Sequence, residues 1–580
     1  MSHRIAKLAC VALLALSSGC ATIPSSGPVV TRSRIAEQGQ AGVMIQPVAP
    51  PKGANPSQIV TGFLTAMASF DAGYATARQY LTDQAAADWN PGSEVLIYTD
   101  ATTPQANGDQ VSMSGRLVGY LRSDGSFSGA EDSSWSHDFG IVEEDGEPRI
   151  SHPPRGLALS QYMFSQIFIQ VDTYFFPPTS TTLVPDPRYV QRGAWDRTAA
   201  ARLVLAGPSD WLGRIVDNQW RSGLTLAGDV ALTSQGVAQV PLSEEARLLT
   251  SGQATLLAIE IAATMRGLPG ISQVRLECAG ESLRMEGLPF GDAMPLAIVE
   301  GYDTQPRGMA ESLAVAQDGV ISLTGQTSAT PVPPDWASAA SQIDSFALRR
   351  EDGAIAAVTD QGLLVGGADE APTNYLERTD LLRPQFDAQG GLWAVAPGDP
   401  PTVALVTRDG LVDVDVTALR GVDIRRFQVS PDGHRMLVVR QADSPAEGNR
   451  QEVGVALIVS TATGVALTSY KPIRLTWEGA DIKSIVDVAW TGPSSVLVLG
   501  SSGAGMPSVF STDLDGLDTA DWGRQRTWSP VEMAVHITSD GVQVAVLDSS
   551  GAVYAYQDDQ WPRLGNDADP VTATAIAYPV

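Results

Sequence analysis

The stretch that decides the fold lies in the C-terminal half of the chain and reads Phe427-Gln428-Val429-Ser430-Pro431-Asp432-Gly433-His434-Arg435-Met436-Leu437-Val438-Val439. Apolar residues before and after its centre are typical of two short β-strands. The Asp432-Gly433 pair between them favours a tight turn, because glycine readily adopts the positive φ that such turns require. The stretch therefore predicts a β-hairpin.

Looser copies of this strand–turn–strand pattern recur from about residue 309 onward, centred on Asp318-Gly319, Asp352-Gly353, Gly390-Gly391, Gly492-Pro493 and Asp540-Gly541. Four-stranded units that repeat every ~40–50 residues are typical of a β-propeller. The sequence thus predicts a propeller of about six blades within residues 291–580. A pair of β-sandwiches is the alternative arrangement. The terminal stretch Thr572–Tyr578 alternates like a strand, so we expect it to close the ring.

Residues 180–290, which precede the propeller, are predicted to form an α+β domain. Helices are expected over residues 198–206 and 254–266, and glycine follows each of them, as is common at helix C-termini. A strand over residues 273–278 places Val274, Leu276 and Cys278 on one face. Because this face is apolar, Cys278 is expected to be a buried, unreactive thiol.

Three stretches of this domain resemble the GerMN module, which is known from spore-germination and envelope proteins and has no established catalytic role. They are Leu205–Ser209, Gly236–Val240 and Met265–Leu276, in this order along the chain. The resemblance implies a GerMN-like α+β fold for residues 180–290.

A further small α+β domain is predicted over residues 54–179. Asn55-Pro56-Ser57-Gln58 is a good helix opening, with a capping asparagine and a proline at the first helical position. Apolar residues then recur every three or four positions from Ile59 to Tyr74, which predicts one amphipathic helix. Short strands are expected afterwards over residues 95–98, 115–120 and 166–171.

The first nineteen residues have the features of a lipoprotein signal peptide. Arg4 and Lys7 precede an apolar run that is too short to span a bilayer. Leu16-Ser17-Ser18-Gly19-Cys20 resembles a lipobox, although Ser17 stands where leucine is usual. This resemblance implies cleavage between Gly19 and Cys20 and lipidation of Cys20, with S-diacylglycerol and an N-palmitoyl group. Residues 20–53 are then expected to be a flexible tether on the extracytoplasmic face of the cell membrane.

The chain is strongly acidic, with a formal net charge of −27. Such a surface repels phosphate backbones, which argues against nucleic-acid binding. Of the three cysteines, Cys10 lies in the predicted signal peptide and Cys20 at the lipidation position, so no internal disulfide is expected. The folded domains are therefore expected to depend on hydrophobic cores.

No catalytic site and no cofactor are predicted from the motifs. The histidines after the signal peptide, His137, His152, His434 and His536, are not spaced as metal ligands. Asp513-Leu514-Asp515-Gly516-Leu517-Asp518 could bind Ca²⁺, but it does not follow the EF-hand order and is expected to be a solvated turn. Most of the seven propeller tryptophans are expected to lie between blades; they are Trp336, Trp393, Trp477, Trp490, Trp522, Trp528 and Trp561.

The order of these parts (lipobox, α+β domain, GerMN-like domain, propeller) resembles the actinobacterial LpqB lipoprotein family over essentially the whole chain. The resemblance implies binding to the extracytoplasmic domain of a membrane sensor histidine kinase, in a two-component system of the MtrA–MtrB type that governs cell-envelope homeostasis. A lipoprotein that binds or processes carbohydrate or peptidoglycan is the alternative, because propellers serve both uses.

Overall fold

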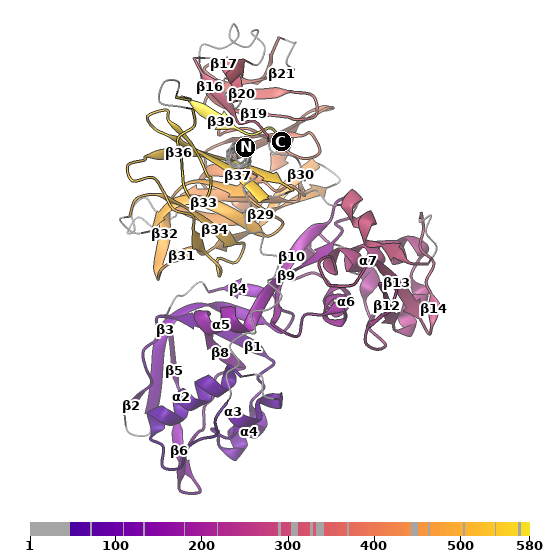
Figure 1. The fold of residues 1–580 in the computed structure, drawn as a ribbon, viewed down its shortest axis with the longest axis vertical. Helices are drawn as coiled ribbons and strands as arrows, with labels where there is room; N and C mark the ends of the chain where they lie inside the picture. Colours follow the sequence, from indigo (N-terminus) through magenta and orange to yellow (C-terminus); the bar gives the residue numbers. More distant parts are fainter. Residues whose placement is uncertain are drawn as a thin grey trace, which may run out of the picture.

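The computed structural model describes residues 47–580 apart from short segments at residues 70–71, 108–109, 131–133, 179, 217–218, 288–291, 303–310, 319, 325–328, 332–341, 368–370, 442–450, 462–463, 503–504, 540 and 566–569. An N-terminal α+β domain, a second α+β domain and a β-propeller follow one another in the chain (Figure 1). This confirms the predicted multidomain fold class. None of the described helices is both long and apolar enough to cross a membrane.

The N-terminal domain packs four helices against a mainly antiparallel sheet with the central order β2-β3-β1-β8. Its helices are α2 (Pro56–Met67), α3 (Ala75–Arg78), α4 (Asp83–Asp88) and α5 (Gln161–Ile167). The sheet strands are β1 (Glu94–Thr99), β2 (Gln105–Asn107), β3 (Gln110–Arg122), β4 (Phe127–Gly129), β5 (Ser134–Asp138) and β8 (Leu157–Ser160), and β6 (Ile141–Glu144) pairs separately with β7 (Glu147–Ile150).

Helix α2 opens as predicted and ends earlier than predicted. The Asn55 side chain accepts from the backbone N–H of Gln58, and the Gln58 side chain accepts from the backbone N–H of Asn55. The helix nevertheless ends at Met67 instead of continuing to Tyr74. Gly73 and Tyr74 both adopt positive φ, at 65° and 56°, which interrupts the helical path. The apolar spacing alone did not reveal this break.

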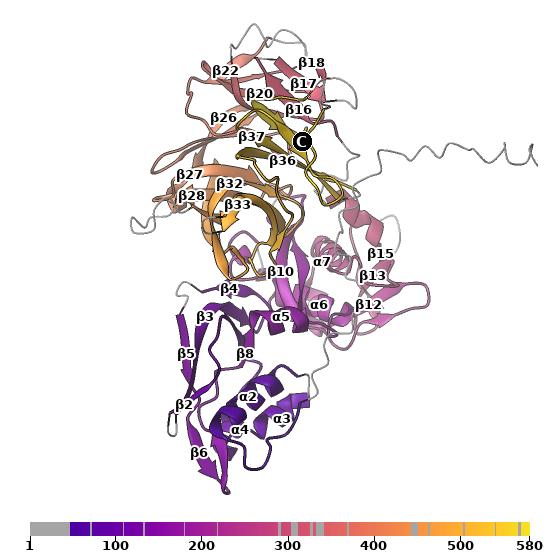
Figure 2. The ribbon, with the colours of Figure 1, turned by 60° about the vertical axis from the view of Figure 1, so that its left-hand side comes forward.

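A long antiparallel hairpin links the two α+β domains. Its strands are β9 (Phe168–Phe175) and β10 (Val184–Gln191), which pair along their whole length. The predicted strand over residues 166–171 is correct only from residue 168, because the last turn of α5 occupies its first two positions. The hairpin lies between the N-terminal domain, the second domain and the propeller (Figure 2).

The second domain is built on the strand order β11-β12-β13-β14, in which β12 and β13 run parallel. Its elements are α6 (Arg197–Ala206), α7 (Ser251–Thr264), β11 (Ala231–Leu232), β12 (Val237–Leu242), β13 (Gln273–Cys278), β14 (Glu281–Ser282) and β15 (Met294–Pro295). Both predicted helices and the predicted strand are present. Leu457, a propeller residue, belongs to the apolar core of this domain, so the two units share packing.

The described residues of the propeller form six blades, of which the third and fourth are joined into one eight-stranded sheet by a short parallel pairing of their outer strands. The first three are β16 (Ala314–Gln317), β17 (Val320–Thr324) and β18 (Ala329–Pro331) with β39 (Ala575–Ala577); β19 (Ile343–Leu348), β20 (Ile355–Thr359), β21 (Gly362–Gly366) and β22 (Thr373–Leu376); and β23 (Gln385–Phe386), β24 (Leu392–Ala396), β25 (Thr402–Thr407) and β26 (Gly410–Asp415). The others are β27 (Ile424–Val429), β28 (Arg435–Gln441), β29 (Gln451–Thr461) and β30 (Gly464–Ile473); β31 (Thr476–Trp477), β32 (Ala480–Trp490), β33 (Ser495–Ser502), β34 (Ser508–Asp513) and β35 (Ala520–Asp521); and β36 (Pro530–Thr538), β37 (Gly541–Asp548) and β38 (Val553–Ala555).

Strand β39 closes the ring, as the sequence predicted. It pairs antiparallel with β16, so that Val315 lies opposite Ile576. The described residues of the final chain stretch thereby complete the first blade, and β39 also contacts β19 and β36 of the adjoining blades. This arrangement covers a strand edge that would otherwise be exposed.

The hairpin at residues 427–439 shows why aspartate and glycine occupy the turn. The Asp432 side chain accepts hydrogen bonds from Ser430 Oγ at 2.8 Å and from the backbone N–H of His434 at 3.0 Å. Gly433 has a φ of 74°, and a Cβ there would lie 2.7 Å from Gln389 Oε1. Asp432 also forms a buried ion pair with Arg435, whose guanidinium lies over the Trp490 ring.

Candidate functional site

The β9–β10 hairpin joins the N-terminal domain to the propeller through buried polar side chains. Asp172 on β9 accepts a hydrogen bond of 2.7 Å from Ser494 Oγ in the fifth blade. Tyr189 on β10 packs in the N-terminal core and donates to Asp513 Oδ2 at 3.0 Å. Burial raises the pKa of both Asp172 and Tyr189. The hairpin therefore holds the two domains in a defined relative position.

The same hairpin joins the N-terminal domain to the second domain. Arg188 donates to Asp186 Oδ2 at 2.7 Å and to the backbone carbonyl of Asp124 at 2.8 Å. Asp186 in turn accepts from the backbone N–H and the hydroxyl of Ser209, at 2.6 and 2.8 Å. Arg188 and Asp186 are each only 2% exposed, so this network is a buried connection between the two domains.

The second domain contacts the propeller directly. Trp211 donates from Nε1 to the backbone carbonyl of Ser469 at 2.8 Å. Ser180 Oγ lies 2.9 Å from Nε2 of His434, the turn histidine of the fourth blade. Together with the packing of Leu457, these contacts make the three domains meet at one junction.

The turn at residues 513–518 belongs to this junction, which corrects the sequence-based prediction of a solvated turn. Asp513 accepts hydrogen bonds from the backbone N–H groups of Asp515 and Leu517, at 3.1 and 3.0 Å. Asp515 is buried and pairs with Lys471 at 2.6 Å. Leu517 packs against the N-terminal core, and its carbonyl accepts from Gln161 at 3.1 Å. The carboxylates therefore contact protein groups of the junction.

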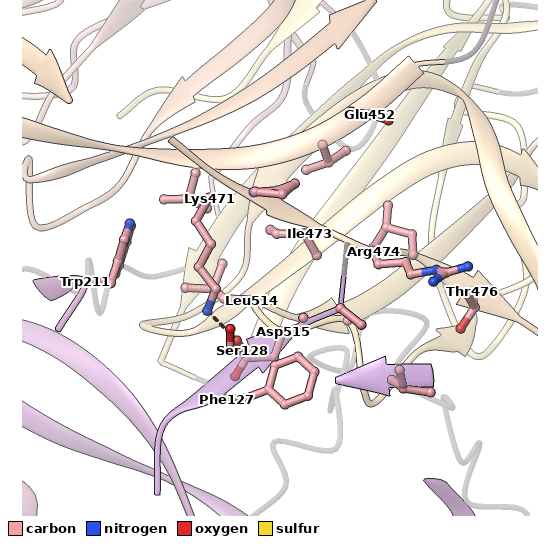
Figure 3. Close-up of a pocket in the computed structure, with 18 of the residues that line it drawn as sticks. Phe127, Ser128, Trp211, Glu452, Lys471, Ile473, Arg474, Thr476, Leu514 and Asp515 are labelled. Carbon is pink, nitrogen blue, oxygen red and sulfur yellow. Dashed lines mark hydrogen bonds and ion pairs between the residues drawn. The ribbon is translucent and has the colours of Figure 1, made fainter. Parts of the chain in front are cut away.

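A cavity of about 1100 Å³ opens at the junction and is lined by residues of all three domains. In Figure 3, Phe127 approaches from the N-terminal domain and Trp211 from the second domain, while the propeller contributes Lys471, Arg474 and Leu514. The dashed line in the figure joins Lys471 to Asp515. The lining thus combines apolar and aromatic side chains with charged ones.

Cationic side chains outnumber acidic ones around this cavity. Seven lysines and arginines line it, together with five aspartates and glutamates. This excess contrasts with the net charge of −27 on the whole chain. Three of the cations surround one carboxylate, because Asp481 lies 3.3 Å from Arg116, 3.6 Å from Arg474 and 4.0 Å from Lys483.

Each of the five lining carboxylates has a cationic partner within 3.3 Å. The pairs are Asp186 with Arg188, Asp210 with Arg122, Glu452 with Arg440, Asp481 with Arg116, and Asp515 with Lys471. These carboxylates therefore act as counterions to the cations around them. Within the described part of the chain, no group of three or more His, Cys, Asp or Glu side chains is placed to hold a metal ion.

Of the remaining residues singled out from the sequence, those that the structure describes lie outside this cavity. Gly19 and Cys20 lie outside the described residues. Cys278 is 3% exposed and donates to the Ser243 carbonyl at 3.5 Å, which confirms a buried thiol. His137 contacts the His152 carbonyl at 2.9 Å, and His536 contacts Arg350. The structure does not bring these histidines together with the cavity.

The propeller tryptophans mainly stabilise blade packing. Trp393, Trp490, Trp528 and Trp561 are buried, while Trp477 and Trp522 are half-buried. Trp528 and Trp561 lie 5.3 Å apart, within a core shared by the last two blades. This agrees with the predicted position between blades. Trp336 lies outside the described residues.

Three family models match successive parts of the chain. Residues 49–165 match "Lipoprotein LpqB, N-terminal domain", residues 172–284 match "Sporulation and spore germination", and residues 318–573 match "Lipoprotein LpqB beta-propeller domain". The middle match confirms the predicted GerMN-like domain, and the last match confirms the propeller.

Curated relatives align along most of the chain. A protein of Cutibacterium acnes described as "Lipoprotein LpqB" is 27% identical over 582 residues and covers 97% of each chain. Proteins of the same description from Streptomyces coelicolor and Mycolicibacterium smegmatis are 26% and 28% identical. They cover 97% and 85% of this chain, and 96% and 86% of their own lengths.

Two solved structures align with parts of the chain. A chain of a nidogen/laminin complex aligns with 46% of this chain and 98% of its own length, with 13% identity and a TM-score of 0.34. The tandem GerMN domains of the sporulation protein GerM from Bacillus subtilis align with 26% of this chain and 55% of their own length, with 13% identity and a TM-score of 0.20.

The domain order and the family matches define the class of protein: an envelope-associated lipoprotein with an N-terminal α+β domain, a GerMN-type domain and a C-terminal propeller. The relatives that align along most of their own length carry the description "Lipoprotein LpqB", which narrows this class to one family. The chain belongs to the LpqB lipoprotein family.

Proposed function

We propose that this lipoprotein binds the extracytoplasmic domain of a membrane sensor histidine kinase of the MtrA–MtrB type and modulates its output, acting in cell-envelope homeostasis. In this proposal the protein is not an enzyme. It is anchored by lipid on Cys20 at the extracytoplasmic face of the cell membrane, after cleavage between Gly19 and Cys20. Membership of the LpqB family supports this role, which the resemblance of the sequence already implied.

The observation that carries the proposal is the three-way junction. Partly buried hydrogen bonds that involve Asp172, Tyr189 and Arg188 join the domains, and Leu457 of the propeller packs in the core of the second domain. A protein held in one shape offers a preformed surface to a partner and loses little conformational entropy when it binds. A partner that binds one kinase state more tightly shifts the kinase towards that state by the difference in affinity.

Anchoring on the same membrane face would favour this encounter. Two proteins confined to one surface meet at a raised effective concentration, so a modest intrinsic affinity is sufficient. The proposed tether of residues 20–53 would have a coil dimension of roughly 30 Å, from ~5–6 Å per square root of residue number. That reach suits contact with a membrane-proximal domain of a neighbouring protein.

The binding test uses a soluble form that begins at residue 47 and the kinase's purified extracytoplasmic domain. We expect a complex in analytical size-exclusion chromatography, and altered kinase phosphorylation in vesicles when the full lipoprotein is present. No complex together with unaltered phosphorylation would contradict the proposal. Binding of purified peptidoglycan or glycan instead would support the alternative function, a lipoprotein that binds or processes envelope carbohydrate.

The anchor is tested separately by replacing Cys20. Cys20→Ala removes the sulfur that the lipobox positions for diacylation, and two acyl chains are what gives stable membrane attachment. We expect the variant to lose acyl labelling and to leave the membrane fraction, whereas Cys10→Ala should remain attached as the matched control. Retention of Cys20→Ala as a labelled membrane protein would show that the lipobox interpretation is wrong.

A further inference from the structure

Three cationic side chains surround the Asp481 carboxylate. Neither the fold nor the proposed kinase contact requires so many cations at this place. Arg116 comes from the N-terminal domain, whereas Arg474 and Lys483 come from the propeller, and all three lie within 4.0 Å of one carboxylate. Arg116 has a second partner, Asp100, at 3.3 Å. Arg474 and Lys483 contact Asp481 only at 3.6 and 4.0 Å, which are long distances for an ion pair. The N–H groups of Arg474 and Lys483 can therefore donate to another acceptor.

These side chains lie at the wall of a cavity that is large enough for an organic molecule. The side chains of Arg474 and Lys483 are 28% and 44% exposed, so a solute can reach both. Arg214 of the second domain also lines the cavity and is exposed. Phe127 and Trp211 provide apolar surface in the same cavity (Figure 3). Cavities of this size at domain interfaces are frequent ligand sites.

We propose that the junction cavity binds a small phosphate-bearing organic molecule, whose phosphate is held by Arg474 and Lys483 beside Arg116. The lining carries an excess of two positive charges, which matches in magnitude and opposes in sign the charge of about −2 on a phosphomonoester. Guanidinium groups suit phosphate because their planar donors form paired hydrogen bonds with its oxygens. Binding involves no covalent step. The phosphate group could belong to a soluble metabolite or to a lipid headgroup, and the test separates these sources.

A ligand bound in the cavity would strengthen the contact between domains, because the cations that hold it come from the N-terminal domain and from the propeller. A phosphate that contacts both Arg116 and the two propeller cations adds a bond between the N-terminal domain and the propeller. Such a ligand stabilises the joined arrangement in proportion to its concentration above its dissociation constant. The inference goes beyond the proposed kinase contact and does not depend on it.

The test measures binding by calorimetry and by the shift in melting temperature. The protein is the soluble form from residue 47, and the probes are glycerol 3-phosphate and inorganic phosphate. Vesicles that contain phosphatidic acid, whose headgroup is a phosphomonoester, are compared with vesicles of phosphatidylcholine in a flotation assay, using the same protein. We expect saturable binding of glycerol 3-phosphate that weakens as salt is raised, since the cations are partly exposed. Binding to phosphatidic acid vesicles alone would identify a headgroup as the source of the phosphate.

Two variants with opposite expected effects locate the site. The double variant Arg474→Gln, Lys483→Gln should weaken phosphate binding at least about tenfold, because it removes two charge-assisted donors. Asp481→Asn should instead tighten binding, by roughly fivefold, because it removes the internal counterion and leaves the three cations in place. A loss of folding cannot produce tighter binding, so the second variant keeps the test informative.

The control for net charge is the double variant Arg378→Gln, Arg425→Gln. Both arginines are exposed propeller residues paired with a nearby aspartate, and neither lines the cavity. Phosphate binding by this control should match the unaltered protein. The proposal is overturned if no probe binds, if the control loses binding as strongly as the cavity variant, or if Asp481→Asn binds more weakly than the unaltered protein.

Discussion

At the scale of single residues, the Arg221–Glu260 ion pair shows how much one buried charge can matter. The two side chains are 2% and 0% exposed. Glu260 also accepts from the backbone N–H of Phe176 at 3.0 Å, and the Arg221 guanidinium lies over the Trp220 ring. Burial raises the pKa of Glu260, and Arg221 opposes that rise. Glu260 on α7 therefore contacts two other segments, through the ion pair with Arg221 and through the hydrogen bond from Phe176, which follows β9.

Replacing Glu260 should be strongly destabilising. Glu260→Ala leaves the Arg221 guanidinium buried without its carboxylate, and breaking such pairs costs about 3–5 kcal/mol. We expect a fall of that size in the free energy of unfolding of the second domain, measured by chemical denaturation followed by tryptophan fluorescence. The double variant Arg221→Met, Glu260→Met should recover much of the loss, because it leaves no unpaired charge.

A surface pair provides the control for this comparison. Glu244 and Arg247 form an exposed ion pair in the same domain, and Glu244→Ala should change stability little. An effect of Glu260→Ala as small as that of Glu244→Ala would contradict the assigned role. The sequence predicted the helix around Glu260 correctly from the spacing of Leu257 and Ile261. The sequence did not predict that Glu260 is buried. A buried carboxylate needs a partner, and its partner Arg221 lies 39 residues away in the chain.

At the scale of elements, the closure of the propeller depends on one short strand. Ile576 on β39 is fully buried and lies opposite Val315 on β16. Truncating a buried isoleucine removes apolar contacts and leaves a cavity, which costs about 2–5 kcal/mol. We expect Ile576→Ala to lower the melting temperature of the propeller, as recorded by scanning calorimetry.

Two further variants sharpen this prediction. Val531→Ala changes an apolar side chain that is 40% exposed, so its melting temperature should remain close to that of the unaltered protein. Removal of residues 571–580 should destabilise the propeller more than Ile576→Ala does, because it exposes the edge of β16. A truncated protein that melts like the full-length protein would mean that the ring is held closed by other contacts.

The strand patterns also show where sequence reasoning reaches its limit. The alternation from Thr572 to Tyr578 predicted the closing strand, but the ladder extends only over Ala575–Ala577. Ala575 and Ile576 point to opposite faces and are both fully buried, since an inner strand is covered on both sides. Alternation therefore located the strand without distinguishing its two faces.

At the scale of the whole molecule, the domain junction should respond to pH through Asp513. Burial, followed by the neighbouring Asp515 carboxylate, raises the pKa of Asp513 to about 6. Tyr189 donates to the same carboxyl group, and Asp515 is itself paired with Lys471. Because the folded-state pKa exceeds the ordinary value of 3.8, the stability contributed by this group is complete below about pH 4. It is lost as pH rises through about 6.

Asp513→Asn tests this pH dependence because asparagine mimics the protonated carboxyl group. We expect the variant to melt at a higher temperature than the unaltered protein at pH 7, and by a clearly smaller margin at pH 4.5. Other titrating groups change the melting temperatures of both proteins alike, so their effects largely cancel in the difference between the two melting temperatures. Asp518→Asn, an exposed position in the same turn, is the control and should show no such trend. A difference that stays constant between pH 4.5 and pH 7 would contradict the prediction.

The junction itself could not have been predicted from the sequence. Three domains were recognisable because each repeats a local pattern, such as the Asp432-Gly433 turn or the helix stop after Ala206. The cavity is lined by residues from Arg116 to Gly516, which share no spacing or motif. The turn at residues 513–518 was correctly predicted to be a turn, but the packing of its Leu517 on the N-terminal core and the bond from Tyr189 to its Asp513 depend on how whole domains dock.

The pairing of β16 with β39 also sets an order of events during biosynthesis. Residues 314–317 are made early in the propeller, but their partner at residues 575–577 follows only after five further blades. Throughout that interval the first blade has an unsatisfied row of backbone donors and acceptors. We therefore expect ring closure to be the slowest step of maturation, since contacts distant in sequence form late.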